Sequence, residues 1–255
     1  MILVLDIGNT NITLGVYRGS ELLFVSRMAT DRRRMEDQYT IELKEILSLH
    51  GVSTGEIEGA AVSSVVPSVN HSLVNAISRL TGKKPVCVGP ETETGIKVDI
   101  QGAETVGADL MVGCVAAANL YGGPCIILDM GTATTFIVLD ENRQMLGGAI
   151  APGVGISLDA LTSRTAQLPS VSLEAPPHAI GRNTAECMRS GLICGTACMV
   201  DGMCNRMERE LGKKCKVVAT GGLAGEIIQQ CSREIIHNDT LLLEGLRLIY
   251  EMNRC

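Results

Sequence analysis

Two short segments of the sequence place an aspartate, a glycine and small hydrogen-bonding side chains in the same order. The first reads DIGNT at residues 6–10, and the second reads DMGTA at residues 129–133. Glycine lets the backbone approach a ligand closely, and successive N–H groups in a tight turn can bind phosphate oxygens. A carboxylate repels a nearby phosphate unless a cation lies between them, so these residue types predict a phosphate site that also holds a metal ion.

The elements around both segments follow one pattern. Each aspartate ends an apolar run, at residues 1–6 and 124–129, and each turn leads into a second strand, another turn and a third strand. The second turns are expected near Gly19 and Asn142. Helical patterns follow in both cases, over residues 36–50 and 184–212. The sequence therefore predicts an α/β chain built by duplication.

The repeat also predicts where a ligand would bind. With an N-terminal half at residues 1–120 and a C-terminal half at residues 121–255, each half contributes one turn. A cleft between two similar domains is a usual place for a small-molecule site. Taken alone, either turn is more simply explained as a hairpin in which the aspartate accepts local backbone N–H groups. The same residues at the same place in both halves favour the phosphate site.

Other phosphate and catalytic motifs are absent from the sequence. It contains no GxxxxGK[ST] or HExxH segment, and GVSTG at residues 51–55 is no GxSxG elbow, because it follows a predicted helix and an elbow follows a strand. The segment GVGISL at residues 153–158 lacks the third glycine and the strand-turn-helix context of a dinucleotide-binding fingerprint. These observations argue against a P-loop enzyme, a Rossmann dehydrogenase and the common hydrolase classes.

The composition disfavours further classes of function. The 255 residues carry a formal net charge of -6 and include four Tyr, two Phe and no Trp, which disfavours binding to nucleic acid or to a membrane surface. The first apolar run contains Asp6 and has no basic segment before it, so we expect a cytoplasmic protein. The ten cysteines are then expected to be thiols, although Cys187, Cys194 and Cys198 would share a helix face and, with His178, leave a metal site as an alternative.

Eight segments occur in the order found in one known family. They are DIGNTNITLGVY, GAD at residues 107–109, DMGTATTF, GGAIAPG, TAQLP, IGRNTAECMRSG, ATGGLA and LEGLRLIYEMN. On these segments, the sequence resembles the type III pantothenate kinases over essentially its whole length. The resemblance implies an actin-like and hexokinase-like ATPase fold with two ribonuclease H-like halves, working as a homodimer. It also implies ATP-dependent phosphorylation of pantothenate to 4'-phosphopantothenate, the first step of coenzyme A synthesis, with Mg²⁺ and with K⁺ or NH₄⁺.

The resemblance implies roles for individual residues. Asp109 would be the general base that takes the proton of the substrate hydroxyl, although without the resemblance we would interpret it as a helix cap. Asp129 would bind K⁺, and Asp6 would bind Mg²⁺ through water. The residues implied in ATP binding are Asp6, Ile7, Gly8, Asn9, Thr10, Asn11, Ile12, Thr13, Gly131, Thr132, Gly221 and Gly222. Those implied in substrate binding are Ile100, Gly107, Ala108, Asp109, Leu110 and Thr184. The resemblance assigns the last of these to a site in the partner subunit.

Two of the substrate-binding positions depart from the family pattern. Leu110 stands where the family carries an arginine suited to a carboxylate, and Ile100 stands where it carries a tyrosine. Phosphorylation of pantothenate remains the leading hypothesis because the ATP-binding segments are intact. The alternative is a nucleotide-binding paralog with a shifted substrate or a regulatory role. An actin-like assembly protein would share the fold class, but it usually needs a larger chain.

A basic run at residues 31–34 allows two interpretations. It consists of Asp31 followed by three arginines. These arginines could contact phosphate, or the run could be a solvated loop, which is the more common situation. The sequence leaves both interpretations open.

Overall fold

The computed structural model describes residues 1–102 and 106–254, which form two compact units. The first unit comprises Met1–Ile96, Gln101–Ala116 and Leu241–Cys255, and the second comprises Lys97–Ile100 and Ala117–Thr240. These units differ from the consecutive halves expected at residues 1–120 and 121–255. The C-terminal helix belongs to the first unit because its apolar residues pack against the first sheet.

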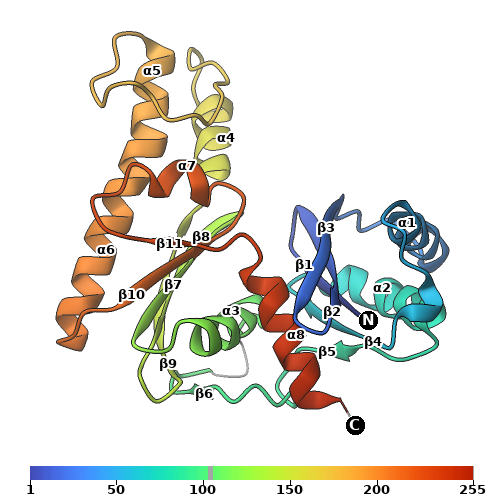
Figure 1. Cartoon of the computed structure of the whole chain (residues 1–255). Coiled ribbons are helices and arrows are strands. Elements are labelled where there is room, and N and C mark those ends of the chain that lie inside the picture. Colours follow the sequence, from blue (N-terminus) through green and yellow to red (C-terminus); the bar gives the residue numbers. More distant parts are fainter. Residues whose placement is uncertain (103–105, 255) are drawn as a thin grey trace. The chain divides into compact units, whose positions relative to one another are not determined.

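The first unit contains a five-stranded sheet. Its strands are β1 (Ile2–Ile7), β2 (Asn11–Arg18), β3 (Glu21–Ala29), β4 (Gly59–Ser64) and β5 (Val86–Cys87), in the order β3-β2-β1-β4-β5 (Figure 1). β2 is antiparallel to β1 and to β3, whereas β4 and β5 run parallel to β1. The turn between β2 and β3 lies at Gly19, which has a φ of 61°, as the sequence predicts.

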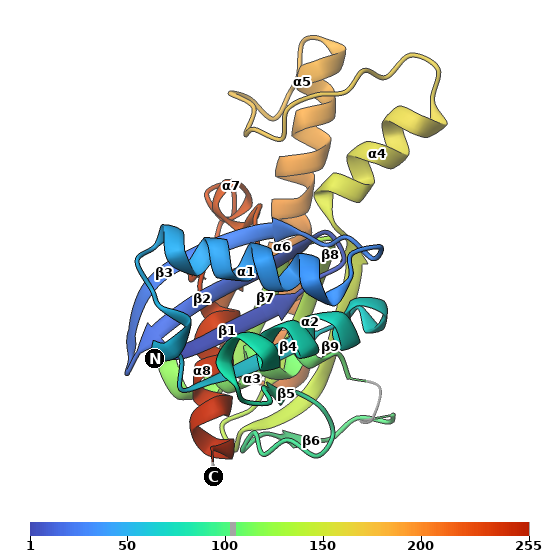
Figure 2. The ribbon, with the colours of Figure 1, turned by 90° about the vertical axis from the view of Figure 1, so that its right-hand side faces the viewer.

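Helices pack on both faces of this first sheet. α1 (Glu36–Leu49) and α2 (Pro67–Thr81) lie side by side on one face, with a short 3₁₀ helix at Thr54–Glu56 between them in sequence (Figure 2). α8 (Leu241–Asn253) and the first part of α3 (Ala108–Leu120) pack on the other face. The helix predicted over residues 36–50 is confirmed.

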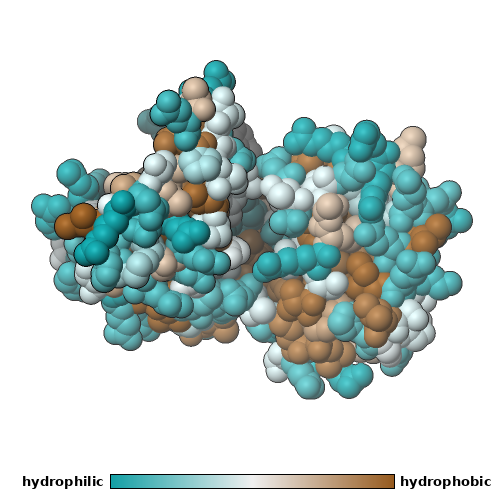
Figure 3. Space-filling view, turned by 90° about the horizontal axis from the view of Figure 1, so that it is seen from above, coloured by the Kyte–Doolittle hydropathy of each residue, from teal (hydrophilic) through white to brown (hydrophobic). Residues whose placement is uncertain are grey.

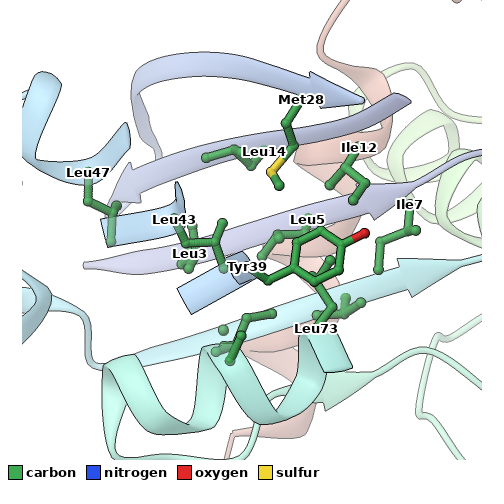
Figure 4. Close-up of a cluster of buried hydrophobic side chains, with 14 of the residues drawn as sticks. Leu3, Leu5, Ile7, Ile12, Leu14, Met28, Tyr39, Leu43, Leu47 and Leu73 are labelled. Atoms are coloured by element: carbon green, nitrogen blue, oxygen red, sulfur yellow. The ribbon is translucent and has the colours of Figure 1, made fainter. Parts of the chain in front are cut away.

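The core under α1 follows from the alternation of the strands. Leu3, Leu5 and Ile7 point from β1 to the same face, where they meet Tyr39 and Leu43 of α1 (Figure 4). All five side chains are fully buried. Because every second residue of β1 is used for this core, Asp6 must point to the opposite face, where α3 and α8 pack.

The second unit repeats the first sheet. Its strands are β6 (Lys97–Val98), β7 (Cys125–Met130), β8 (Ala133–Leu139), β9 (Gln144–Pro152), β10 (Lys216–Thr220) and β11 (Ile236–His237), in the order β11-β10-β7-β8-β9-β6. From β11 to β9 the order and the strand directions match those of the first sheet, and β6 is an added edge strand. Even the register shift between Val16 and Tyr17 has a counterpart between Val138 and Leu139. The duplication predicted from the sequence is confirmed.

The helices of the second unit pack mainly on one face of its sheet. They are α4 (Val154–Arg164), α5 (Thr184–Arg189), α6 (Gly195–Leu211) and α7 (Ala224–Ile228). A π-helical turn at Ser190–Cys194 joins α5 to α6, so the three segments form one continuous rod (Figure 1). The rod ends at Gly212, which has a φ of 67°. The helix predicted over residues 184–212 is therefore confirmed, with one local widening.

One prediction about residues 153–158 is wrong. Gly153 lies between β9 and α4, so the segment does have a strand, a turn and a helix. The next strand in the chain, β10, is separated from β9 in the sheet by β7 and β8, however, whereas the strands on either side of a Rossmann fingerprint lie side by side. The order of the strands in the sheet therefore still excludes a Rossmann dinucleotide-binding fold.

Hydrophilic residues cover much of the visible surface, and the apolar residues gather in several small groups and one broad one (Figure 3). The most exposed large apolar side chains are Ile180, Leu49, Ile150 and Met35. In the part of the chain that the structure describes, no helix is long and apolar enough to cross a membrane.

Candidate active site

The turn between β1 and β2, residues 8–10, is held from two sides. The N–H of Gly8 donates to the carbonyl oxygen of Asn11 at 3.0 Å and closes the turn. Thr30, which follows β3, donates its N–H to the carbonyl oxygen of Thr10 at 3.0 Å and its hydroxyl to that of Gly8 at 2.7 Å. We call residues 8–10 turn 1. Its shape is set by backbone bonds, so it is organised before any ligand binds.

The turn between β7 and β8, residues 131–132, is one residue shorter, and we call it turn 2. The N–H of Gly131 donates to the carbonyl oxygen of Ala133 at 3.0 Å. Gly153, which follows β9, donates its N–H to the carbonyl oxygen of Thr132 at 3.2 Å. This bond is the counterpart of the bond from Thr30 to Thr10, so the duplication extends to the way each turn is held.

Gly153 is required by the close approach of two backbone segments. A Cβ at this position would lie 2.4 Å from the carbonyl oxygen of Thr132 and 2.5 Å from that of Gly131. Such distances are well inside a van der Waals contact, so any side chain would displace turn 2. In the first unit the equivalent residue is Thr30, whose side chain instead forms a hydrogen bond to its turn.

The residues expected to bind ATP at the first turn fall into two groups. The exposed or partly exposed ones are Asp6, Gly8, Asn9, Thr10, Asn11 and Thr13. Ile7 and Ile12 are fully buried in the core under α1. Their side chains therefore belong to the core, and only their backbone groups lie next to the turn.

Asp6 is flanked by two hydroxyl residues on neighbouring strands. It pairs with Thr13 of β2 and with Ser63 of β4. All three side chains point to the face of the sheet that packs against α3 and α8, since their strand neighbours fill the core on the opposite face. The hydroxyl oxygen of Ser63 is buried and has no hydrogen-bond partner in the structure.

Asp129 has the same surroundings in the second unit. It pairs with Thr135 of β8 and with Thr220 of β10. The three side chains again lie on one face, because residues on either side of them enter the core under α4 to α7. The hydroxyl oxygen of Thr135 is buried without a partner, as is that of Ser63.

These flanking hydroxyl residues were not predicted from the sequence. Thr135 and Thr220 lie inside the segments DMGTATTF and ATGGLA, but no role was assigned to them, and only the strand order brings Ser63 and Thr220 beside the aspartates. The repeat itself carried the signal, because a duplicated sheet implies matched neighbours on the fourth strand of each half.

The donor atoms at both aspartates are oxygens. Carboxylate and hydroxyl oxygens suit hard cations such as Mg²⁺ and K⁺. Among the described residues, no group of three His, Cys, Asp or Glu side chains is arranged to hold a metal ion, so Cys187, Cys194 and Cys198 form no such site with His178.

The end of β10 approaches the end of β7 at Gly221. This residue has a φ of 99°, and a Cβ on it would lie 2.6 Å from the carbonyl oxygen of Met130. Gly222 is exposed, with no atom within 4 Å of the place where its Cβ would stand. The pair makes a turn into α7 that brings bare backbone to the surface beside turn 2, as expected for a residue pair that contacts a nucleotide.

Asp109 lies in the first turn of α3. The helix begins at Ala108, so Asp109 is not the cap residue before the helix that the sequence without the resemblance suggests. Its Oδ1 accepts the N–H of Leu110 at 2.8 Å. Gly107 leaves room for this carboxylate, since a Cβ there would lie 2.4 Å from the same Oδ1.

The environment of Asp109 strengthens it as a base. Burial raises the pKa of its carboxyl above the ordinary value, and the hydrogen bond from Leu110 only partly opposes this effect. A carboxylate with a raised pKa takes up a proton more readily. α3 packs on the same face of the first sheet to which Asp6 points, so Asp109 and Asp6 share one side of the unit.

The two departures from the family pattern lie in different units. Leu110 lies next to Asp109 in α3. Ile100 follows β6, and its Cγ2 is 3.7 Å from the place where a Cβ of Gly147 in β9 would stand. Gly107, Ala108 and Leu110 are thus next to Asp109, and Ile100 lies at the edge of the second sheet.

Thr184 lies apart from turn 2 within its own unit. It is the first residue of α5, where the Asn183 side chain caps the helix by accepting the N–H of Glu186 at 2.9 Å. It lines an apolar hollow of about 410 Å³ together with Leu161, Leu168, Cys187, Met188, Gly191 and Leu192. Leu161 is seven residues along α4 from its start beside turn 2, roughly 10 Å at the rise of a helix. Thr184 therefore lies beside the second half of α4.

Solved structures share this fold. A protein from Campylobacter jejuni described as a conserved putative Baf family transcriptional activator has a TM-score of 0.64 and 17% identity, with 98% of each chain covered. An inorganic polyphosphate/ATP-glucomannokinase from Arthrobacter sp. has a TM-score of 0.53 and 13% identity, with 99% of each chain covered. At these identities the likeness concerns the fold alone, which is the actin-like and hexokinase-like ATPase fold.

Sequence comparison identifies the family. The family model for type III pantothenate kinase matches residues 2–206. A type III pantothenate kinase from Moorella thermoacetica is 44% identical, with 99% of this chain and 100% of the relative covered. Another, from Exiguobacterium sp., is 46% identical with both chains fully covered. The chain therefore belongs to the type III pantothenate kinase family.

Proposed function

We propose that this protein transfers a phosphoryl group from ATP to the primary hydroxyl of pantothenate and releases 4'-phosphopantothenate and ADP. The observation that carries the proposal is the repeated turn, in which each unit places an aspartate flanked by hydroxyl residues beside a glycine turn. Family membership supports pantothenate as the acceptor. The full-length identity of 44% and 46% to proteins named as such kinases favours this reaction over a non-catalytic paralog.

Asp109 would act as the general base. The hydroxyl oxygen of pantothenate forms a bond to the terminal phosphorus of ATP, the bond from that phosphorus to the bridging oxygen breaks, and the hydroxyl proton passes to the Asp109 carboxylate. An alcohol is a weak nucleophile, so proton removal by a positioned carboxylate typically contributes about 10² to 10⁴ in rate. The half-buried setting and raised pKa of Asp109 suit this role.

The two turns and the glycine pair would hold the nucleotide. Turn 1 and turn 2 present backbone N–H groups and short polar side chains, which bind phosphate oxygens. Gly221 and Gly222 would let the nucleoside lie against bare backbone. In phosphoryl transfer most of the rate comes from such positioning and from charge neutralisation, and little from covalent chemistry.

Asp6 would hold hydrated Mg²⁺, and Asp129 would hold K⁺. The carboxylates and the hydroxyl residues that flank them in the sheets are donors that fit these ions. When bound, the cations would neutralise the negative charge of the phosphates. NH₄⁺ could replace K⁺.

A homodimer would complete the substrate site. Thr184 lies beyond α4 from turn 2 of its own chain, so a contact with substrate is best supplied to the partner subunit. The hollow beside Thr184 is lined mainly by apolar residues, as a surface covered by a second chain would be.

A coupled assay for ADP tests the proposal. ADP formation by the wild type should require pantothenate, Mg²⁺ and K⁺, and the Leu110→Arg variant should show a lower KM for pantothenate because it restores a partner for the carboxylate. ADP formation that is equal with and without pantothenate in both proteins would contradict the proposed acceptor.

A further inference from the structure

The segment that follows β3 is fastened to turn 1. Thr30 bonds to both ends of the turn, as described above. Beyond Thr30, the carbonyl oxygen of Asp31 accepts the N–H of Arg34 at 3.2 Å and the hydroxyl of Tyr39 at 2.9 Å. Tyr39 is fully buried under the sheet, so residues 30–34 are anchored to the core at one end and to turn 1 at the other.

The three arginines of this segment have different partners. Arg33 lies 3.4 Å from the carboxylate of Asp31, and Arg34 forms an ion pair with Glu42. Arg32 forms no ion pair among the described residues. Its Nη2 donates instead to the side-chain oxygen of Asn9 in turn 1, at 3.3 Å.

Arg32 thus places a full positive charge on the turn that is proposed to bind phosphate. The Asn9 oxygen is a neutral acceptor, and the guanidinium has five N–H donors, most of which remain free for another ligand. A guanidinium bonds to phosphate oxygens in pairs, and bonds between charged groups are about twice as strong as neutral ones. The exposed side chain can keep its contact with Asn9 or exchange it for phosphate.

We infer that Arg32 contacts the phosphate groups of ATP at turn 1, and that Arg33 and Arg34 stabilise the loop through their ion pairs. The inference rests on the proposed function, because it takes turn 1 as a phosphate site. It resolves the two interpretations of the basic run by assigning one arginine to the ligand and two to local ion pairs. Arg32 would also oppose the growing charge on the phosphates as ADP departs.

The test compares Arg32→Gln with Arg33→Gln. Both variants remove one exposed arginine from the same loop, but only the first removes a side chain that contacts turn 1. We expect Arg32→Gln to weaken ATP binding by about 10- to 100-fold, the loss typical of a hydrogen bond to a charged group. Arg33→Gln should stay within about twofold of the wild type, and Arg32→Lys should be intermediate because lysine keeps the charge without the paired donors.

Binding of ATP and of adenosine, measured by calorimetry, gives a readout independent of turnover. Adenosine has no phosphate, so its affinity should be the same in all four proteins, and thermal unfolding should show that they are equally folded. Equal ATP affinity in Arg32→Gln and Arg33→Gln would overturn the inference, as would an equal loss of adenosine affinity. Wild-type protein that binds ATP but fails to phosphorylate pantothenate would refute the proposed function alone, whereas wild-type protein that fails to bind ATP would refute both.

Discussion

At the level of single residues, Asp109 matters most, because the proposed reaction needs it as the general base. Its carboxylate is half-buried, which costs free energy when it is ionised, and its Oδ1 accepts the N–H of Leu110. Asp109→Asn should lower kcat by about 10² to 10⁴ without lowering the temperature of unfolding, since the amide oxygen can accept the same bond. Asp159→Asn, at an exposed position of α4, is the control and should change neither quantity. A variant that loses activity and stability together would point to a structural role for Asp109.

The raised pKa of Asp109 predicts a pH dependence. The base must be ionised to accept a proton, so kcat at saturating ATP and pantothenate should fall on acidification through a pKa above the ordinary 3.8. The sign for stability is the reverse. A raised folded-state pKa gives a stabilising contribution that is fully present below 3.8 and is lost as the pH rises through the folded value. Asp109→Asn should remove this loss, and an acidic limb near 3.8 in the wild type would contradict the assignment.

Sequence reasoning found some site residues and missed others for a physical reason. Asp6 and Asp129 could be predicted because the turn chemistry is local in sequence, and Asp109 needed the family resemblance because a lone acidic residue at a helix start usually serves the helix. Ser63 and Thr220 could not be found, because their position depends on which distant strand lies beside the aspartate.

At the level of elements, the residue after the third strand of each unit bonds to the turn that is proposed to bind phosphate. Gly153→Ala would place a Cβ 2.4 Å from the carbonyl oxygen of Thr132, so turn 2 should shift and kcat/KM for ATP should fall. Overpacking of this kind typically costs about 1–3 kcal/mol of unfolding free energy. Gly155→Ala is the matched control two residues later, in α4, where a Cβ meets nothing within 4 Å.

Gly153→Ala and Gly155→Ala should change the free energy of unfolding in opposite directions. Alanine in a helix is favoured over glycine by about 0.5–1 kcal/mol, so Gly155→Ala should be slightly more stable than the wild type and equally active. Chemical denaturation together with the ATP kinetics separates the two cases. If Gly153→Ala behaved like Gly155→Ala, the close contact with turn 2 would have no functional meaning.

Long, strongly patterned elements were predictable from the sequence, and short edge elements were not. The helix at residues 184–212 follows from its apolar spacing and its terminal Gly212. The edge strand β6 has only two residues, and it exists because β9 offers an open edge. The position of β6 cannot be derived from its own sequence, because the free energy that stabilises it comes from pairing with β9.

At the scale of the whole molecule, the proposal requires two chains. We expect a particle of twice 27.0 kDa in solution. Leu161→Glu places a charge in the apolar hollow beside Thr184 and should give monomers that have lost pantothenate-dependent activity. Leu49→Glu, at an exposed apolar residue of α1, should leave both mass and activity unchanged. Light scattering measures the mass of each variant in solution. An active, monomeric Leu161→Glu variant would refute the shared site.

The duplication explains why the features of the site come in pairs. Two copies of one sheet supply two turns, two aspartates flanked by hydroxyl residues and two matched backbone bonds. The central claim is that this frame, with Asp109 as base, phosphorylates pantothenate. The most direct measurement is mass spectrometry of pantothenate after incubation with ATP, Mg²⁺, K⁺ and either the wild type or Asp109→Asn. The account predicts one added phosphoryl group with the wild type and almost none with the variant. Unmodified pantothenate alongside the wild type, or equal phosphorylation by both proteins, would contradict it.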